Sequence, residues 1–162
     1  MNGKTVRCVP AAVAGEAAAT RPAEVRREAG MLRPLSTVVI TSYGAAHHDV
    51  PQGVRPVTVD ASLLPEPDAV SRVGQQLGGR SPAARAYVAR SPAGRLVVGQ
   101  ALERIRQRLG PSGEIAVHVR SPHGQYRAPA VAEELADQLR AAGVPVQVTH
   151  RHLGRPDPPA AR

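Results

Sequence analysis

The sequence predicts an α/β domain in which helices pack on a small layered sheet, and two observations lead to this class. Short β-branched runs alternate with longer amphipathic segments, which is the order that a layered α/β architecture requires. Serine–proline pairs and glycines stand where the helices should begin and end. We expect one domain over residues 35–154, a disordered or mis-assigned extension over residues 1–34, with Met31 as an alternative start, and a flexible tail over residues 155–162.

The first two strands are predicted from β-branched runs. The run "STVVIT" (residues 36–41) ends at "SYG", and the run "PVTVD" (residues 56–60) follows a polar loop. Two helices come next. Ser81 and Ser91 are each followed by proline, which is the pattern of an N-cap followed by the first helical position. The second helix should end at Gly110–Pro111, and its buried face should include Leu96, Val97, Gln100, Ala101, Leu102, Ile105 and Leu109.

The last part of the chain reads as strand, loop, helix and strand. The third strand is "EIAVHV" (residues 114–119), and the fourth is "VPVQVTH" (residues 144–150). Between them, apolar residues recur at helical spacing from Pro129 to Ala142, and Gly143 should end this helix. Pro129 fits the first helical position, which would leave Ala128 as the N-cap.

Composition limits the possible functions. The net charge is +8, but residues 35–154 carry 13 basic and nine acidic side chains, so the domain itself is only mildly basic. Cys8 is the single cysteine, which excludes a disulfide framework and a thiol nucleophile in the domain. No apolar run is long enough to span a membrane. We expect a cytoplasmic protein that does not bind a membrane and that requires no cofactor.

The loop "RSPHGQYR" after the third strand is the strongest candidate site. The first amides of a helix have no intrahelical partner, and alanine at the N-cap position cannot cap them. Gly124 permits a tight turn, and Arg127 could bind two phosphate oxygens. The loop could therefore bind an anion, or it could be a surface turn with a solvated arginine. Ser121 and Arg127 have the spacing of a phosphatase loop, but serine without a partner base is a poor nucleophile, so we predict no catalytic residue.

Two other polar clusters accompany this loop. His47, His48 and Asp49 could border the same pocket; we do not predict a metal site, because adjacent histidines diverge on an extended chain and no third ligand is indicated. His150 and His152 are predicted to share one face of an extended strand end, where they could line a phosphate pocket with Arg151 or face solvent.

A second partner suggested by the residues is RNA. Arginines are frequent along the two middle helices, and a helix face of this kind can follow a phosphate backbone without reading its sequence. Few aromatic residues are available to stack on bases. The arginines concerned are Arg85, Arg90, Arg95, Arg104, Arg106 and Arg108.

The ordered series of motifs resembles the C-terminal domain of the RapZ family of RNase adapter proteins. The segment "VHVRSPHGQYRAPAVAEELADQLRAAGVPVQVTHRHL" is similar to the family's G-C-T-G-G-x-H-R-S-V-x-x-A-E-x-L and H-R-D-L patterns. "ITSYGAAHH", "VDASLLPEP" and "RAYVARSP" match its other segments in the same order. The chain departs from the pattern at Arg120, Ser121, Pro122 and His123, which replace Gly, Cys, Thr and Gly, and at Tyr126, Ala128 and His152.

The resemblance implies a small α/β domain that binds an amino-sugar phosphate such as glucosamine-6-phosphate, takes part in RNA-linked regulation and self-associates into homo-oligomers. Full-length members also carry a P-loop domain, but this sequence contains no G-x-x-x-x-G-K-S/T motif, so nucleotide binding is not carried over. The predicted phosphate-binding residues are Ser121, His123, Gly124, Gln125, Arg127 and Arg120. The predicted pocket rim comprises Tyr43, Gly44, His47, His48, Asp60, His150 and Arg151.

Overall fold

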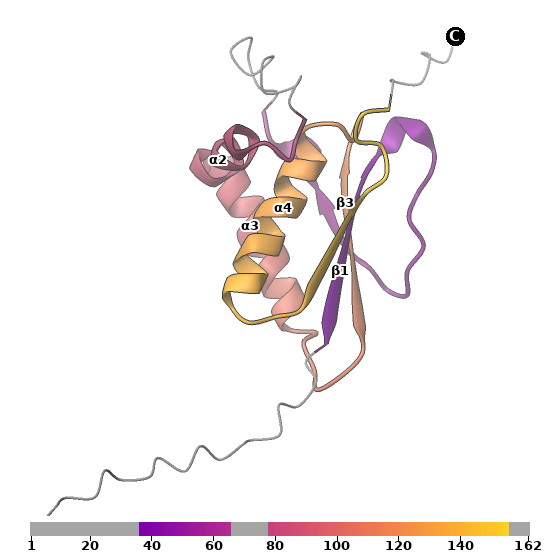
Figure 1. Ribbon diagram of the computed structural model, residues 1–162, viewed down its shortest axis with the longest axis vertical. Helices are drawn as coiled ribbons and strands as arrows, with labels where there is room; N and C mark the ends of the chain where they lie inside the picture. Colours follow the sequence, from indigo (N-terminus) through magenta and orange to yellow (C-terminus); the bar gives the residue numbers. More distant parts are fainter. Residues whose placement is uncertain (1–35, 66–77, 156–162) are drawn as a thin grey trace, which may run out of the picture. The chain divides into compact units, whose positions relative to one another are not determined.

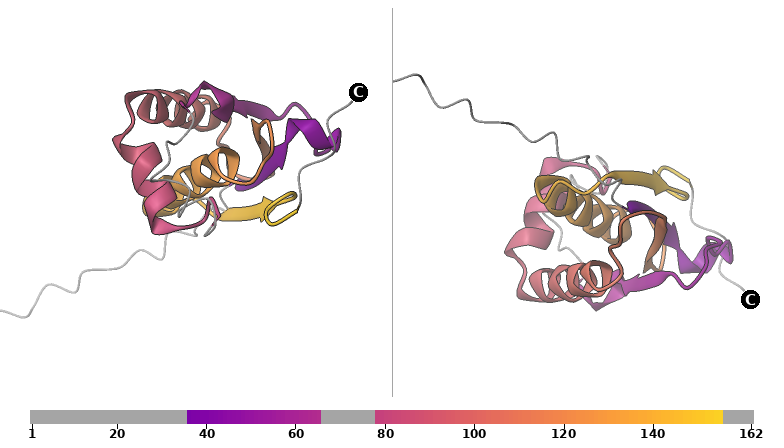
Figure 2. Two further views of the ribbon diagram at one scale, coloured as in Figure 1. Left: turned by 90° about the horizontal axis from the view of Figure 1, so that it is seen from above. Right: turned by 90° about the horizontal axis from the view of Figure 1, so that it is seen from below.

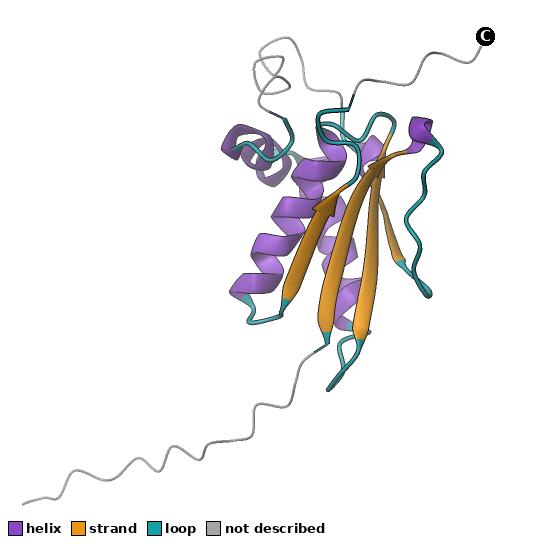
Figure 3. Ribbon diagram, turned by 45° about the vertical axis from the view of Figure 1, so that its right-hand side comes forward, coloured by secondary structure: helices purple, strands orange, loops and turns teal. Residues whose placement is uncertain are grey.

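The computed structural model describes residues 36–65 and 78–155. These residues form a four-stranded parallel sheet with three α-helices packed on one of its faces, as Figures 1 and 3 show. The predicted α/β class is therefore confirmed. The extension expected over residues 1–34 and all but the first residue of the expected tail lie outside the described residues.

The strand order places β1 and β3 at the centre of the sheet and β2 and β4 at its edges. The order is β2-β3-β1-β4, and the strands are β1 (Thr37–Gly44), β2 (Val57–Asp60), β3 (Glu114–Ser121) and β4 (Val146–His150). Short 3-10 turns, η1 (Ala45–His47) and η2 (Ala61–Leu63), follow β1 and β2. Because every pairing is parallel, all four carboxyl ends lie at the same edge of the sheet.

β1 and β3 are longer than the sequence pattern predicts. β1 includes Ser42, Tyr43 and Gly44, where the sequence predicts the end of the strand and the start of a polar loop, and β3 includes Arg120 and Ser121. The two extensions pair with each other, Tyr43 with Arg120 and Gly44 with Ser121. Neither segment is a strong strand former alone, so the reciprocal pairing of the backbones outweighs local preference.

The first two helices begin where the serine–proline pairs predict. The Ser81 hydroxyl accepts a hydrogen bond from the Ala84 amide (3.2 Å) at the start of α2 (Pro82–Arg90). The Ser91 hydroxyl accepts one from the Gly94 amide (3.3 Å) at the start of α3 (Pro92–Arg106). Helix α3 ends at Arg106, before the stop predicted at Gly110–Pro111. Its buried face differs from the prediction at Leu96, which is 60% exposed, and at Gln100, which is also exposed.

Helix α4 (Arg127–Ala141) begins two residues earlier than predicted. Its N-cap is Tyr126 rather than Ala128, and Pro129 is the third helical residue. Proline is tolerated there because the amides of the first turn have no intrahelical acceptor in any helix. The expectation that no side chain caps this helix is confirmed, since Tyr126 makes no side-chain capping hydrogen bond.

Strand alternation separates the two faces of the sheet. Val38, Ile40, Val117 and Val119 have no exposed side-chain surface and pack with the helices. The three helices lie together on one side of the sheet when it is seen from above and from below (Figure 2). On the other face, the segment between β1 and β2 lies over β3; a Cβ atom added to Gly53 would be 2.9 Å from the Cβ of Ala116.

Candidate functional site

The carboxyl edge of the parallel sheet brings together most of the residues predicted for the site. In open α/β sheets, ligands bind outside the carboxyl ends of the strands. Here that edge is built from η1 after β1, the loop at residues 122–126 after β3, and the chain after β4. The structure thus places the predicted phosphate loop beside the predicted rim residues of β1 and η1.

Two glycines allow the loop after β3 to contact the end of β1 directly. Gly124 has a φ of +73°, and a Cβ atom there would lie 2.3 Å from the backbone nitrogen of Gly44. A Cβ atom on Gly44 would lie 2.4 Å from the His123 carbonyl oxygen. The Ala46 amide also donates to the Pro122 carbonyl (3.0 Å). The tight turn predicted at Gly124 is confirmed, and its backbone is fixed against β1.

Ser121 holds this loop in place. Its side chain points to the helix-covered face, is 3% exposed, and accepts a hydrogen bond from the Gly124 amide (3.2 Å). The loop then leads into α4, whose first amides receive no capping side chain. The positive end of the α4 dipole therefore lies at the carboxyl edge of the sheet, where it favours a negative charge.

The two arginines predicted to bind phosphate are hydrogen-bonded to protein groups. Nη1 of Arg127 donates to the Leu64 carbonyl after η2 (3.1 Å). Arg120 lies in β3 and binds the Asp60 carboxylate through Nη2 (2.6 Å) and Nε (3.1 Å). Burial alone would raise the pKa of Asp60, but hydrogen bonds from Arg120 and Ser62 outweigh it and hold the pKa below its ordinary value.

A histidine pair lies beside the Gly44–Gly124 contact. The His152 side chain is 1% exposed, and its Nδ1 accepts a hydrogen bond from the Gly44 amide (2.9 Å). Its ring stacks on that of His47 with 4.0 Å between centroids. Because Nδ1 accepts, the neutral ring carries its proton on Nε2, 3.5 Å from an Asp49 carboxylate oxygen. Burial, and then the neighbouring His47, lower the pKa of His152.

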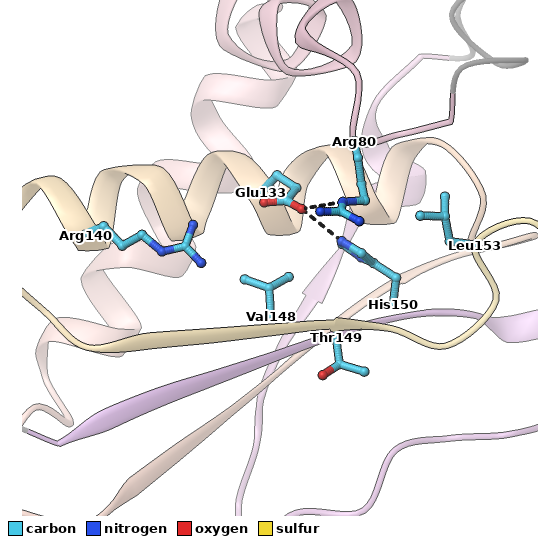
Figure 4. Close-up of a pocket in the computed structure, with 7 residues that line it drawn as sticks. All are labelled: Arg80, Glu133, Arg140, Val148, Thr149, His150 and Leu153. Carbon is cyan, nitrogen blue, oxygen red and sulfur yellow. Dashed lines mark hydrogen bonds and ion pairs between the residues drawn. The ribbon is translucent and has the colours of Figure 1, made fainter.

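His150 faces away from this pair, so the prediction that His150 and His152 share a face is wrong. β4 ends at His150 and the chain bends at Arg151, so the strand alternation does not reach His152. The His150 ring lies between Ser42 Oγ (2.7 Å from Nδ1) and Glu133 Oε1 (3.1 Å from Nε2), and Arg80 Nε binds the same Glu133 oxygen at 3.1 Å (Figure 4). The alternative that these histidines face solvent is also wrong, since both are largely buried.

Sequence reasoning left Ser42 and Glu133 out of the site. Ser42 occupies an inward position of β1, and a polar residue at such a position is a signal that it has a buried partner. Glu133 lies beside the buried residues of α4. The identity of each partner depends on contacts more than 15 residues apart, which no local pattern contains.

The remaining predicted residues lie around the carboxyl edge of the sheet. Arg151 forms an ion pair with Asp49, and His48 is exposed in the left-handed conformation that ends η1. His123 is exposed, and the Gln125 side chain donates to the Arg155 carbonyl (2.6 Å). Within residues 36–65 and 78–155, no group of three histidine, cysteine or acidic side chains is arranged to hold a metal ion.

The arginines of the predicted RNA-binding face make contacts within the protein. Arg104 donates to the Thr58 carbonyl (2.9 Å), and Arg108 donates to the Arg55 carbonyl. Arg85 pairs with Asp137. Part of the predicted RNA-binding face therefore packs beside β2, and the rest is exposed to solvent. None of the helices in the described part of the chain is long and apolar enough to cross a membrane.

Comparison with known proteins gives two matches. The model of the family described as the RapZ C-terminal domain matches residues 36–154. A nucleotide-binding protein of Frankia alni is 32% identical over 104 residues, which are 61% of this chain and 36% of that protein. The chain thus spans little more than a third of the length of this curated relative.

Proposed function

The chain belongs to the RapZ C-terminal domain family, and from this premise we propose that it is a non-catalytic regulatory module that binds a phosphorylated small molecule. The ligand class is a sugar phosphate, with an amino-sugar phosphate such as glucosamine-6-phosphate as the first candidate. The phosphate binds at the loop of residues 121–127, and the sugar lies towards η1.

The observation that carries this proposal is the uncapped start of α4 beside a loop that is fixed against β1. The backbone contact between Gly44 and Gly124 holds the loop in one geometry, so its amides need little reorganisation when an anion arrives. The first turn of α4 has no side-chain cap and presents the positive end of the helix dipole, although Pro129 contributes no amide to it.

Two further features support binding without chemistry. The Ser121 hydroxyl is buried and accepts from Gly124, so it is engaged in holding the loop instead of being directed at a ligand. His152 is held neutral by the hydrogen bond from Gly44 and by burial. Its ring is buried and stacks on His47, whereas a general base needs an accessible proton acceptor.

The arginines act in this proposal by exchanging partners. Arg127 leaves the Leu64 carbonyl for a phosphate oxygen, and a charge-assisted hydrogen bond of this kind is about twice as strong as one between neutral groups. Arg120 stays with Asp60, on the sheet face away from the helices, where the register places Arg120 beside the buried Tyr43. Asp60 then stays paired with Arg120 at the border of the site and does not accept a hydrogen bond from a sugar hydroxyl.

Thermal unfolding of the full chain with ligand tests the proposal. A ligand that binds only the folded state stabilises it by about 2.7 kcal/mol at one hundred times its Kd. We expect a saturable rise in Tm with glucosamine-6-phosphate and a smaller rise with inorganic phosphate. The Arg127→Gln variant should lose most of the rise, whereas Arg106→Gln, an exposed arginine in the last turn of α3, should keep it.

The outcomes separate the parts of the proposal. Equal rises with inorganic phosphate and the sugar phosphate would retain the anion site and reject the sugar. Equal rises in Arg127→Gln and Arg106→Gln would place the anion elsewhere. The absence of any rise with the sugar phosphate or with inorganic phosphate would refute phosphate binding by this chain.

A further inference from the structure

The outer edge of β4 offers unpaired backbone groups. In its pairing with β1, the Val38 amide donates to the Pro145 carbonyl (2.9 Å) and the Arg151 amide donates to the Ser42 carbonyl (3.0 Å). Successive residues of a strand direct their amides and carbonyls to opposite sides. The amides and carbonyls of Val146, Val148 and His150 therefore point away from the sheet, and none of the hydrogen bonds recorded among the described residues occupies those of Val146 and Val148.

The opposite edge of the sheet is covered. Arg104 of α3 donates to the Thr58 carbonyl of β2, and Arg108, in the turn after α3, donates to the Arg55 carbonyl just before β2. Side chains that bind edge carbonyls in this way prevent another chain from pairing there. The same sheet thus has one blocked edge and one that is available for pairing.

A groove runs beside the available edge, between β4 and α4. Its volume is about 550 Å³, and it is lined by Arg80, Glu133, Arg140, Val148, Thr149, His150 and Leu153 (Figure 4). Glu133 and Arg140 are seven residues apart on α4, which corresponds to about 10 Å along the helix axis. At roughly 3.3 Å per residue, an extended chain would place about three residues along this length.

Both arginines of the groove have an acidic neighbour, Glu133 for Arg80 (3.1 Å) and Asp137 for Arg140 (3.5 Å), but the two guanidinium groups are the more exposed partners at the groove. The Arg80 and Arg140 side chains are 64% and 46% exposed, whereas Glu133 is 15% exposed and is held by Arg80 and His150. Figure 4 shows the Arg140 guanidinium directed into the space above Val148, with Glu133 further along α4 and Arg80 reaching Glu133 from the segment before α2. A carboxylate in the groove would meet the two guanidinium groups, and an apolar side chain would meet Val148 and Leu153.

We propose that the β4–α4 groove binds an extended peptide segment of a partner protein, which adds as a fifth strand to β4 and carries a carboxylate for Arg80 or Arg140. The backbone of the segment pairs with the outward groups of Val148, and its alternate side chains enter the groove. This is the β-augmentation mode of peptide recognition, in which main-chain hydrogen bonds provide affinity and the adjoining pocket provides specificity. The proposal does not depend on the phosphate site.

A library of random heptapeptides displayed on phage is the probe, and selection uses the full-length chain. We expect the selected peptides to combine β-branched and acidic residues without a central proline. For a synthetic selected peptide, Val148→Pro should weaken binding about tenfold or more, because it removes an outward amide that pairs with the peptide. Proline is tolerated on the solvent side of an edge strand, and thermal unfolding checks that the variant is folded.

Two further variants control this test. Val148→Ala keeps the amide and should bind more tightly than Val148→Pro. Arg140→Gln removes an exposed ion pair with Asp137, which should lower Tm only slightly, and it should weaken binding of acidic peptides. Peptide binding should also slow amide hydrogen exchange at Val148 but not at Gln147, whose amide already pairs with β1.

Three results would overturn the proposal. The first is a selection that enriches no peptide over the starting library. The second is a selected peptide that binds Val148→Pro as tightly as the unchanged chain. The third is a concentration-dependent dimer that Val148→Pro converts to monomer, which would assign the edge to a second copy of this chain.

Discussion

Substituting Gly124 by alanine tests whether the loop after β3 is fixed by its contact with β1. Gly124 has a φ of +73°, and an added Cβ would meet the Gly44 nitrogen at 2.3 Å. Gly143, after α4, has almost the same conformation, with a φ of +77°, but an added Cβ there meets nothing within 4 Å. The pair therefore separates the cost of the backbone conformation from the cost of the contact.

The expected magnitudes follow from these two environments. Alanine in the left-handed region costs about 1–2 kcal/mol, and both substitutions share this cost. The loss of chain entropy in the unfolded state is also the same for both. Only Gly124→Ala adds an overlap with backbone, and overpacking typically costs about 1–3 kcal/mol more. We expect Gly124→Ala to destabilise by about 2–5 kcal/mol and Gly143→Ala by about 1–2 kcal/mol.

Urea unfolding of both variants, followed by circular dichroism, measures the difference directly. Unchanged m-values would show that the free energies of unfolding are comparable. If Gly124→Ala and Gly143→Ala destabilise the chain equally, the loop moves away from Gly44 without penalty. The argument that the loop geometry is preorganised for an anion would then fail.

Further substitutions test other parts of the structure. Gly99→Ala in α3 should stabilise the chain by about 0.5–1 kcal/mol, because an added Cβ there meets nothing within 4 Å. Gly94→Ala in the same helix should destabilise the chain, because its Cβ would lie 2.2 Å from a carbonyl oxygen of α2. Equal Tm values for the two variants would contradict this reasoning. The pKa of His152 is lowered by folding, so the free energy of unfolding should decrease as the pH falls below about 6.5, where the unfolded chain binds more protons. In His152→Asn, which keeps an acceptor for the Gly44 amide, the free energy of unfolding measured with urea should depend less on pH. The part of the pH dependence that comes from His118, whose pKa is also lowered, should remain. A pH dependence equal to that of the unchanged chain would exclude His152 as its source.

Local signals predicted the helices and the class of fold. The hydroxyls of Ser81 and Ser91 each accept a hydrogen bond from the amide three residues later. The signal for the start of each helix therefore lies within four adjacent residues. The extension of β1 to Gly44 could not be predicted in this way, because it depends on Ser121, its pairing partner in β3. Likewise, the start of α4 depends on the loop that precedes it, and the rule for proline at the first position misplaced it by two residues.

The candidate site could be predicted as a region but not as a set of contacts. The sequence identified the loop with Gly124 and Arg127, and the structure places that loop at the carboxyl edge beside Gly44. The contact of Arg127 with the Leu64 carbonyl joins residues 63 positions apart. The opposite orientations of His150 and His152 depend on where β4 ends, which is set by its pairing with β1.

The arginines that α3 places over β2 also limit how large an assembly the sheet can form. Growth of a sheet from molecule to molecule needs two open sides, one to receive a neighbour and one to extend to the next. With Arg104 on a β2 carbonyl and Arg108 on the Arg55 carbonyl just before that strand, the sheet formed by the described residues has one open edge. Complexes built through the sheet should therefore stop at a one-to-one stoichiometry, and the parallel sheet is protected against polymerisation even at high protein concentration.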